Sequence, residues 1–171
     1  VRTIDSKTFI ATGVFSDSCD NLKLVHPYFC YMDTNFNILK ARYYRVNGRC
    51  HIDSYYFNIL KGNKYLDFGV GVYLGSFIKN GYAMCVDSTL DSVIFCKYFS
   101  RKGYCVFGQE LPDGNIMLGA NFDSVGACVI KLDSIGNILW CKSIVRPTGI
   151  FLSAVVNDDG TLMITGINDY L

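Results

Sequence analysis

Eight cysteines and two histidines are the side chains of this 171-residue chain most suited to metal binding or nucleophilic attack. A zinc site needs about four converging Cys or His ligands, usually presented by closely spaced pairs. The chain has no Cys-x-x-Cys pair, and its nearest approaches are His26 with Cys30 and Cys50 with His51. Adjacent strand residues point to opposite faces, so Cys50 and His51 would diverge. We predict no metal site, with His26 in a loop and His51 at a turn edge.

Catalytic motifs are equally scarce in the sequence. A Ser or Cys nucleophile needs a neighbouring His and an orienting carboxylate, and no Gly-x-Ser-x-Gly motif occurs. Two acidic pairs, Asp87 with Asp91 and Asp158 with Asp159, have the residue types of a glycosidase acid and base. Both pairs fall in expected hairpin turns, where Asp commonly caps its own backbone. We therefore predict no catalytic and no cofactor-binding residue, with a glycosidase-like pair as the alternative.

The cysteines fit a structural role better than a chemical one. Cys96 and Cys141 each precede a lysine at matching positions, and Ala41 fills the same position earlier in the chain. Free Cys is among the most buried residue types, so we expect Cys96 and Cys141 to be buried, reduced and unligated. Many free thiols indicate a reducing or anaerobic setting. The alternative is a disulfide among three other cysteines, Cys19, Cys30 and Cys50.

The composition is that of a folded domain, with 50% apolar, 15% aromatic and 18% charged residues and a net charge of +1. These values exclude disordered and collagen-like classes. No uncharged apolar run reaches about 18 residues, and no basic start precedes an apolar segment, so neither a membrane span nor a signal peptide is expected. The sequence begins with Val1 and not with the Met that starts a translated protein, and it ends at Leu171 just after an apolar run. We expect a piece of a longer protein.

Recurring turns divide the chain into units that must position any site. Apolar runs end in glycines spaced by 56, 50 and 47 residues, at Gly13, Gly69, Gly119 and Gly166. Turn aspartates are spaced by 54 and 46 residues, at Asp33, Asp87 and Asp133. Each unit holds about four short β-type runs, and helical spacing is absent. The pattern predicts an all-β fold: residues 1–171 form a partial β-propeller of about three four-stranded antiparallel blades.

Two segments resemble known propeller repeats. Leu152–Gly166 resembles the first two strands of a WD-type blade. The run Leu-Asp-x-x-Gly-Asn-x-x-Trp-x-Lys at 132–142 resembles repeats of secreted or surface propeller proteins common in Bacteroidota, and is similar to the tryptophan-docking segment of quinoprotein dehydrogenases. In the quinoprotein family that motif is structural, and none of its cofactor or calcium ligands matches here. The resemblance thus implies a fold, with a quinoprotein-like or glycosidase-like enzyme, whose catalytic residues lie mostly outside the chain, as the alternative function.

Charge suggests where a partner would bind. The long connections between successive units carry five basic residues and no acid, namely Arg45, Arg49, Arg101, Lys102 and Arg146. If these connections surround a channel mouth, the five form a basic rim that favours an anionic ligand or protein surface; otherwise they only solvate loop ends. We predict a non-catalytic binding or structural module, at the cell surface, secreted or within a large assembly. A second copy or missing blades would complete the ring.

Overall fold

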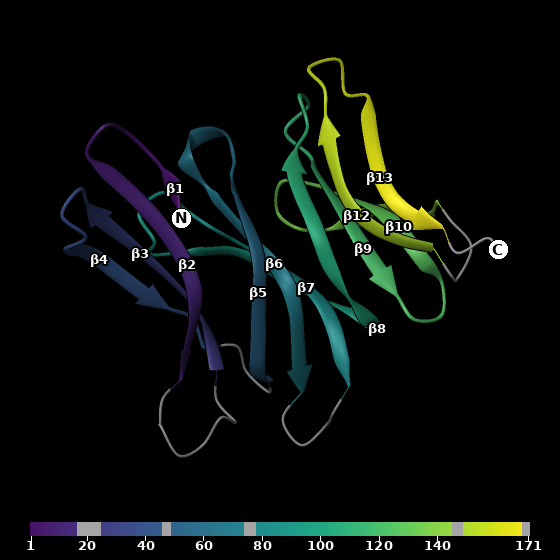
Figure 1. The fold of residues 1–171 in the computed structure, drawn as a ribbon, viewed down its shortest axis with the longest axis horizontal. Coiled ribbons are helices and arrows are strands. Elements are labelled where there is room, and N and C mark those ends of the chain that lie inside the picture. Colours follow the sequence, from purple (N-terminus) through teal and green to yellow (C-terminus); the bar gives the residue numbers. More distant parts are fainter. Residues whose placement is uncertain (17–24, 46–48, 74–77, 145–148, 169–171) are drawn as a thin grey trace.

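The computed structural model describes residues 1–16, 25–45, 49–73, 78–144 and 149–168, which form antiparallel strands joined by short turns (Figure 1). Within these residues the only helical element is a single 3-10 turn, η1 (Lys61–Asn63), and no helix is long and apolar enough to cross a membrane. The predicted all-β class is confirmed. The strands are β1 (Arg2–Thr3), β2 (Thr8–Ser16), β3 (Val25–Asp33), β4 (Ile38–Tyr43), β5 (Arg49–Ile59), β6 (Tyr65–Tyr73), β7 (Lys79–Val86), β8 (Val93–Glu110), β9 (Ile116–Phe122), β10 (Gly126–Leu132), β11 (Ile138–Ser143), β12 (Gly149–Val156) and β13 (Leu162–Asn168).

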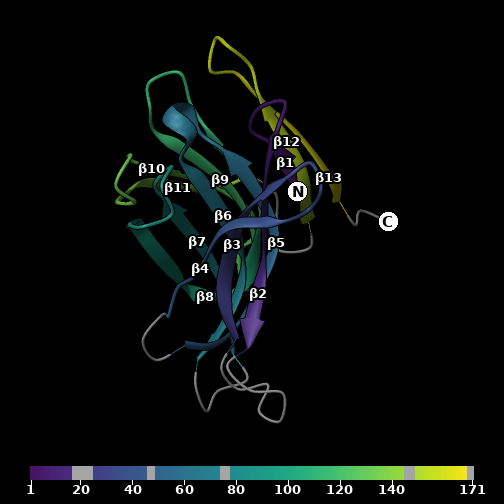
Figure 2. The ribbon, with the colours of Figure 1, turned by 90° about the vertical axis from the view of Figure 1, so that its left-hand side faces the viewer.

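Within each sheet, every strand pairs with the next strand along the chain, whereas β4 does not pair with β5 and β11 does not pair with β12. Sheet 1 contains β1 to β4, and sheet 4 contains β12 and β13. The long strand β8 belongs to two sheets, because its first part pairs with β7 and its second part, from Gly103, pairs with β9. Sheet 2 therefore contains β5, β6, β7 and the first part of β8, and sheet 3 contains the rest of β8 with β9, β10 and β11. The four sheets do not close into a barrel or ring over the described residues (Figures 1 and 2).

The first two strands of every sheet are joined by the same kind of tight turn, and these turns lie along the upper edge of Figure 1. In each turn a backbone N–H donates to the carbonyl oxygen four residues later. The donors are Ile4, Leu60, Leu111 and Asn157, which are spaced by 56, 51 and 46 residues. Counting from these donors places Ala120, rather than the predicted Gly119, level with Gly69 and Gly166.

Both faces of sheets 2 and 3 are covered by neighbouring sheets. Alternate residues of a strand point to opposite faces. In β6, Tyr65 packs with residues of sheet 1 whereas Leu66 packs with residues of sheet 3. In β9, Ile116 packs towards sheet 2 and Met117 towards sheet 4. We call the side that faces the preceding sheet the backward face, and the side that faces the following sheet the forward face.

Side-chain amides add polar links between successive sheets. Asn121 of β9 donates to the Phe151 carbonyl oxygen at 2.8 Å and accepts from the Phe151 N–H at 2.6 Å. Gln109 exchanges a longer pair of hydrogen bonds with the backbone of Val156, at 3.3 and 3.5 Å. Because Asn121 is buried, removing it would leave the Phe151 backbone groups unpaired, so this link fixes where sheet 4 lies on sheet 3.

Candidate functional site

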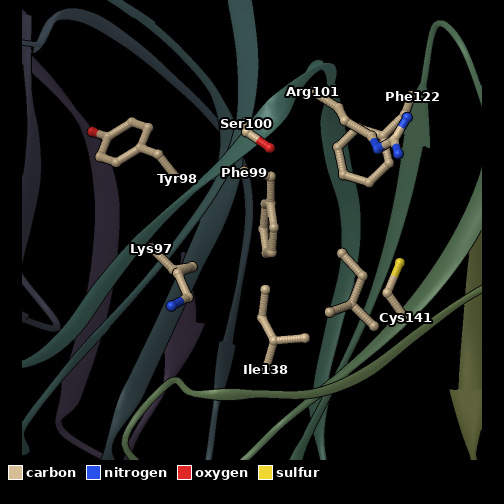
Figure 3. A pocket seen from close by; sticks show the side chains of 9 residues that line it. Lys97, Tyr98, Phe99, Ser100, Arg101, Phe122, Ile138 and Cys141 are labelled. Atoms are coloured by element: carbon tan, nitrogen blue, oxygen red, sulfur yellow. The ribbon is translucent and has the colours of Figure 1, made fainter.

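A cavity of about 310 Å³ opens between sheet 2 and sheet 3 (Figure 3). Residues 97–101 of β8 line one side, and residues of β9, β10 and β11 line the other. Strand alternation explains the lining of β8, since Lys97 and Phe99 share the forward face, whereas Tyr98 packs towards sheet 1. The remaining lining residues are Ser100, Arg101, Phe122, Ile130, Ile138 and Cys141.

The floor of the cavity is apolar and rigidly packed. Phe99, Phe122 and Ile130 are all buried, and the rings of Phe99 and Phe122 meet edge to face with centroids 6.0 Å apart. Aromatic pairs in this geometry add to the stability gained from burial. An apolar floor of this kind suits a flat or branched hydrocarbon group.

Basic groups flank the floor. Figure 3 shows Lys97 and Arg101 on either side of Phe99. The Arg101 guanidinium donates to the Ser124 hydroxyl at 3.1 Å, and none of the nine lining residues is acidic. Neither cation has a carboxylate within 4.0 Å among the described residues, so their charges are not neutralised there.

Asn80 holds the segment of β8 that carries Arg101. Its buried side-chain amide donates to the carbonyl oxygens of Phe99 at 2.8 Å and Arg101 at 3.2 Å. At Gly103, where β8 passes from sheet 2 to sheet 3, φ is +146°, a conformation that residues with a Cβ rarely adopt. Asn80 and Gly103 therefore position the basic side of the cavity without lining it.

The cysteine predictions are partly wrong. Cys141 is exposed on the cavity wall and Cys96 is half-buried, because both lie on the last strand of a sheet, which has less cover than the inner strands. Neither Cys96 nor Cys141 forms a disulfide, and nor do the other cysteines whose side chains the structure describes. Burial, with a smaller effect from the neighbouring Cys141, raises the pKa of the Cys128 thiol to about 11. Cys128 is therefore a protonated, unreactive thiol at neutral pH. Cys19 and the side chain of Cys50 lie outside the described residues.

The five residues of the predicted basic rim have different placements. Arg45 is exposed after β4, with its guanidinium 5.9 Å from the centre of the Tyr43 ring. Arg101 and Lys102 are exposed in the middle of β8. The side chain of Arg49 and all of Arg146 lie outside the described residues, so a common rim stays a prediction. Of the three whose side chains are described, only Arg101 lines the cavity.

Sequence reasoning missed Lys97 and Ser100. The signal that would have found Lys97 is its spacing, because Lys97, Phe99 and Arg101 are alternate residues of one strand. His26 was also misplaced, since it is buried in β3 and its ring stacks on Tyr43 with centroids 6.0 Å apart. An aromatic neighbour on the next strand explains that burial.

No cluster of three or more His, Cys, Asp or Glu side chains suited to a metal occurs in the described part of the chain.

One member of each acidic pair, Asp87 and Asp159, caps its own turn, as predicted for the pairs. Asp87 accepts hydrogen bonds from the backbone of Asp91 and Ser92 and from the Thr89 hydroxyl. Slight burial acts to raise the pKa of Asp87, but these hydrogen bonds outweigh it and lower the pKa. The Lys40 ammonium, 2.8 Å from Asp91, lowers the pKa of that carboxyl.

In the second pair, Asp159 has the same role. Asp159 accepts from the Thr161 backbone N–H at 2.8 Å, which lowers its pKa. These carboxylates satisfy backbone donors of their own turns, and such turn caps have a structural role.

Comparison with known proteins adds information on the fold only. No protein-family model and no curated protein sequence matches the chain. A crystal structure of a protein of unknown function from Bacteroides caccae is similar, with a TM-score of 0.54 and 12% sequence identity. The similarity covers 92% of this chain and 50% of that protein, so the chain spans about half of its length. No particular propeller family is supported.

Proposed function

We propose that the four sheets are consecutive blades of a β-propeller-type fold and that the chain is a non-catalytic binding module. Support for the blades comes from the strand order, since each sheet is built from strands that follow one another in the chain. Further support comes from the shared turn geometry and from the face-to-face packing of successive sheets. Radial packing of four-stranded antiparallel sheets is the arrangement of propeller blades.

The ligand class follows from the cavity between sheets 2 and 3. Its apolar floor favours a hydrocarbon group, and the two cations on either side of Phe99 favour a negative charge on the ligand. We therefore assign the site to an amphipathic anion, such as an aryl or alkyl phosphate, sulfonate or carboxylate.

One observation carries this assignment: Lys97 and Arg101 have no carboxylate partner among the described residues. Two other cations at sheet junctions are paired with acids. Lys64 lies 3.5 Å from Glu110, and Arg42 lies 3.3 Å from Asp91. Two unpaired cations beside one apolar floor make a surface that an anion can neutralise at little desolvation cost.

Calorimetric titration with naphthyl phosphate and with its neutral counterpart naphthol tests the proposal. We expect the phosphate to bind more tightly than naphthol, and its affinity to fall as salt rises. Exchanging both cations, in a Lys97→Ala, Arg101→Ala double variant, should weaken phosphate binding about tenfold or more.

Lys142→Ala is the matched control, because Lys142 is an exposed lysine of the adjacent β11 whose ammonium lies 5.2 Å from the centre of the Trp140 ring, outside the cavity lining. This control should leave affinity unchanged. Equal binding of naphthol and naphthyl phosphate, or an unaffected double variant, would refute the assignment.

A further inference from the structure

The outer sheets each have one face that no described sheet covers: the forward face of sheet 4 and the backward face of sheet 1. We propose that a second copy of this chain covers both. The forward face of sheet 4 in one copy packs on the backward face of sheet 1 in the other. The inference rests on the blade arrangement proposed above and concerns a surface separate from the cavity between sheets 2 and 3.

The forward face of sheet 4 has the pattern of an interface that lacks its partner. Met163 follows its turn donor by six residues, as Leu66 and Met117 follow theirs. Leu66 is 0% exposed and Met117 is 7% exposed, whereas Met163 is 64% exposed. Ile167 repeats the contrast, because Val70 at the matching position of sheet 2 is buried. Apolar residues therefore occupy positions that in sheets 2 and 3 contact the following sheet.

The backward face of sheet 1 shows the complementary pattern. Phe36, Leu90 and Gly136 each follow a turn aspartate by three residues. Leu90 is fully buried in the cluster between sheets 1 and 2, and Gly136 lies so close to Phe95 of sheet 2 that a Cβ there would approach it to 2.5 Å. Phe36 is 72% exposed, and among the described residues its ring stacks on Phe9 alone, with ring centroids 6.4 Å apart. Sheet 1 thus presents an aromatic surface where sheets 2 and 3 contact their preceding sheets.

A second copy fits these two faces because they are the two halves of one kind of junction. Sheets 1 and 4 lie at opposite ends of the molecule, so a single copy does not join them (Figure 1). Two copies arranged head to tail form two identical junctions and close a ring with twofold symmetry. Two copies of this chain together would match the length of the similar Bacteroides caccae protein, since one copy covers half of it.

Sedimentation equilibrium of the chain over a range of concentrations tests the proposal. We expect a species with twice the chain mass of 19.2 kDa. Met163→Glu and Phe36→Asp should each weaken self-association about tenfold or more, since each places a charge inside an apolar junction. Both residues are exposed in the single copy, and Asp tolerates the positive φ of Phe36 (63°), so both variants should fold.

The matched control is Ile135→Glu, which changes a 62% exposed isoleucine in a turn of sheet 3. This variant should still form the dimer. Mixing the two junction variants should give a dimer joined at one intact junction, in which the unchanged forward face of the Phe36→Asp variant packs on the unchanged backward face of the Met163→Glu variant. A single-copy mass for the unmodified chain, an open polymer, or variants that associate normally would each overturn the proposal. Titration of the variants with naphthyl phosphate tests the binding function separately from self-association. The cavity lies within one copy, so a variant that no longer self-associates should still bind naphthyl phosphate.

Discussion

The inner sheets 2 and 3 and the outer sheets 1 and 4 are built from the same strand pattern but differ in what covers them. Met117 and Met163 make the contrast clearest, because the same residue type at the same distance from its turn is buried in sheet 3 and exposed in sheet 4. Burial in this molecule is thus decided by the neighbouring sheet and not by the local sequence. A strand pattern identifies which face a residue occupies, and only the packing of sheets shows whether that face is closed.

Glycines of sheet 3 and sheet 1 show a similar contrast at particular positions. Gly103 and Gly119 are inner-sheet glycines, and a Cβ at either would collide, with the Asn121 carbonyl oxygen at 2.0 Å or with the Phe151 ring at 2.5 Å. Gly13 of sheet 1 has no atom within 4 Å of such a Cβ among the described residues. Gly103 and Gly119 therefore need glycine for close approach, whereas the position of Gly13 has room for a side chain.

The largest expected effect is that of Gly103→Ala. The positive φ and the collision with the backbone of Asn121 should together cost about 3 kcal/mol or more of unfolding free energy. The matched change Gly13→Ala should alter stability by about 1 kcal/mol or less. Urea unfolding of both variants measures the difference, and equal losses would break the contrast between inner and outer sheets.

The methionine pair gives the next largest effect. Met117→Ala should cost about 2 to 4 kcal/mol, because it leaves a cavity between sheets 3 and 4. Met163→Ala should cost about 0.5 kcal/mol or less when measured at concentrations where the chain is a single copy. Thermal unfolding provides the comparison, and a large loss from Met163→Ala in the single copy would show that its face is already covered.

Acid sensitivity is the smallest expected effect. Lys131, 2.8 Å from Asp113, lowers the pKa of that carboxyl to about 2, below its ordinary value of 3.8. The folded form therefore binds this proton less readily than the unfolded chain does. Its contribution to stability is complete above pH 3.8 and is lost as the pH falls through about 2.

Asp113→Asn should thus reduce the fall of the melting temperature between pH 4 and pH 2. Turn aspartates in sheets 1 and 4 also have lowered pKa values, so acid should weaken turns in inner and outer sheets alike. An unchanged pH profile in the variant would contradict the role given to this carboxylate.

Much of the local structure could be read from the sequence. Asp33, Asp87 and Asp133 begin tight turns, as their spacing predicted, because an Asp side chain caps backbone donors within a few residues. Such contacts are local, so sequence order alone determines them. Strand type followed in the same way from turn residues and β-branched or aromatic runs.

The site was harder to predict because it depends on contacts between sheets. Cys141 was expected in the core and instead lines the cavity. It lies on the last strand of sheet 3, and how much of that strand is covered depends on how the sheets pack. Lys97 is a candidate binding residue for the same reason, because sheet 3 lies close to the first part of β8. Residues distant in sequence create this surface, and no local pattern encodes their distances.

Hydrogen exchange of the Met163→Glu variant is the most direct test of the central claim that stacking of sheets determines stability along the chain. This variant removes self-association from the comparison. We predict the slowest amide exchange in β6, β7, β9 and β10, which are covered on both faces, and faster exchange in β4 and β13 at the ends of the stack. Exchange in β13 as slow as in β9 would contradict the claim.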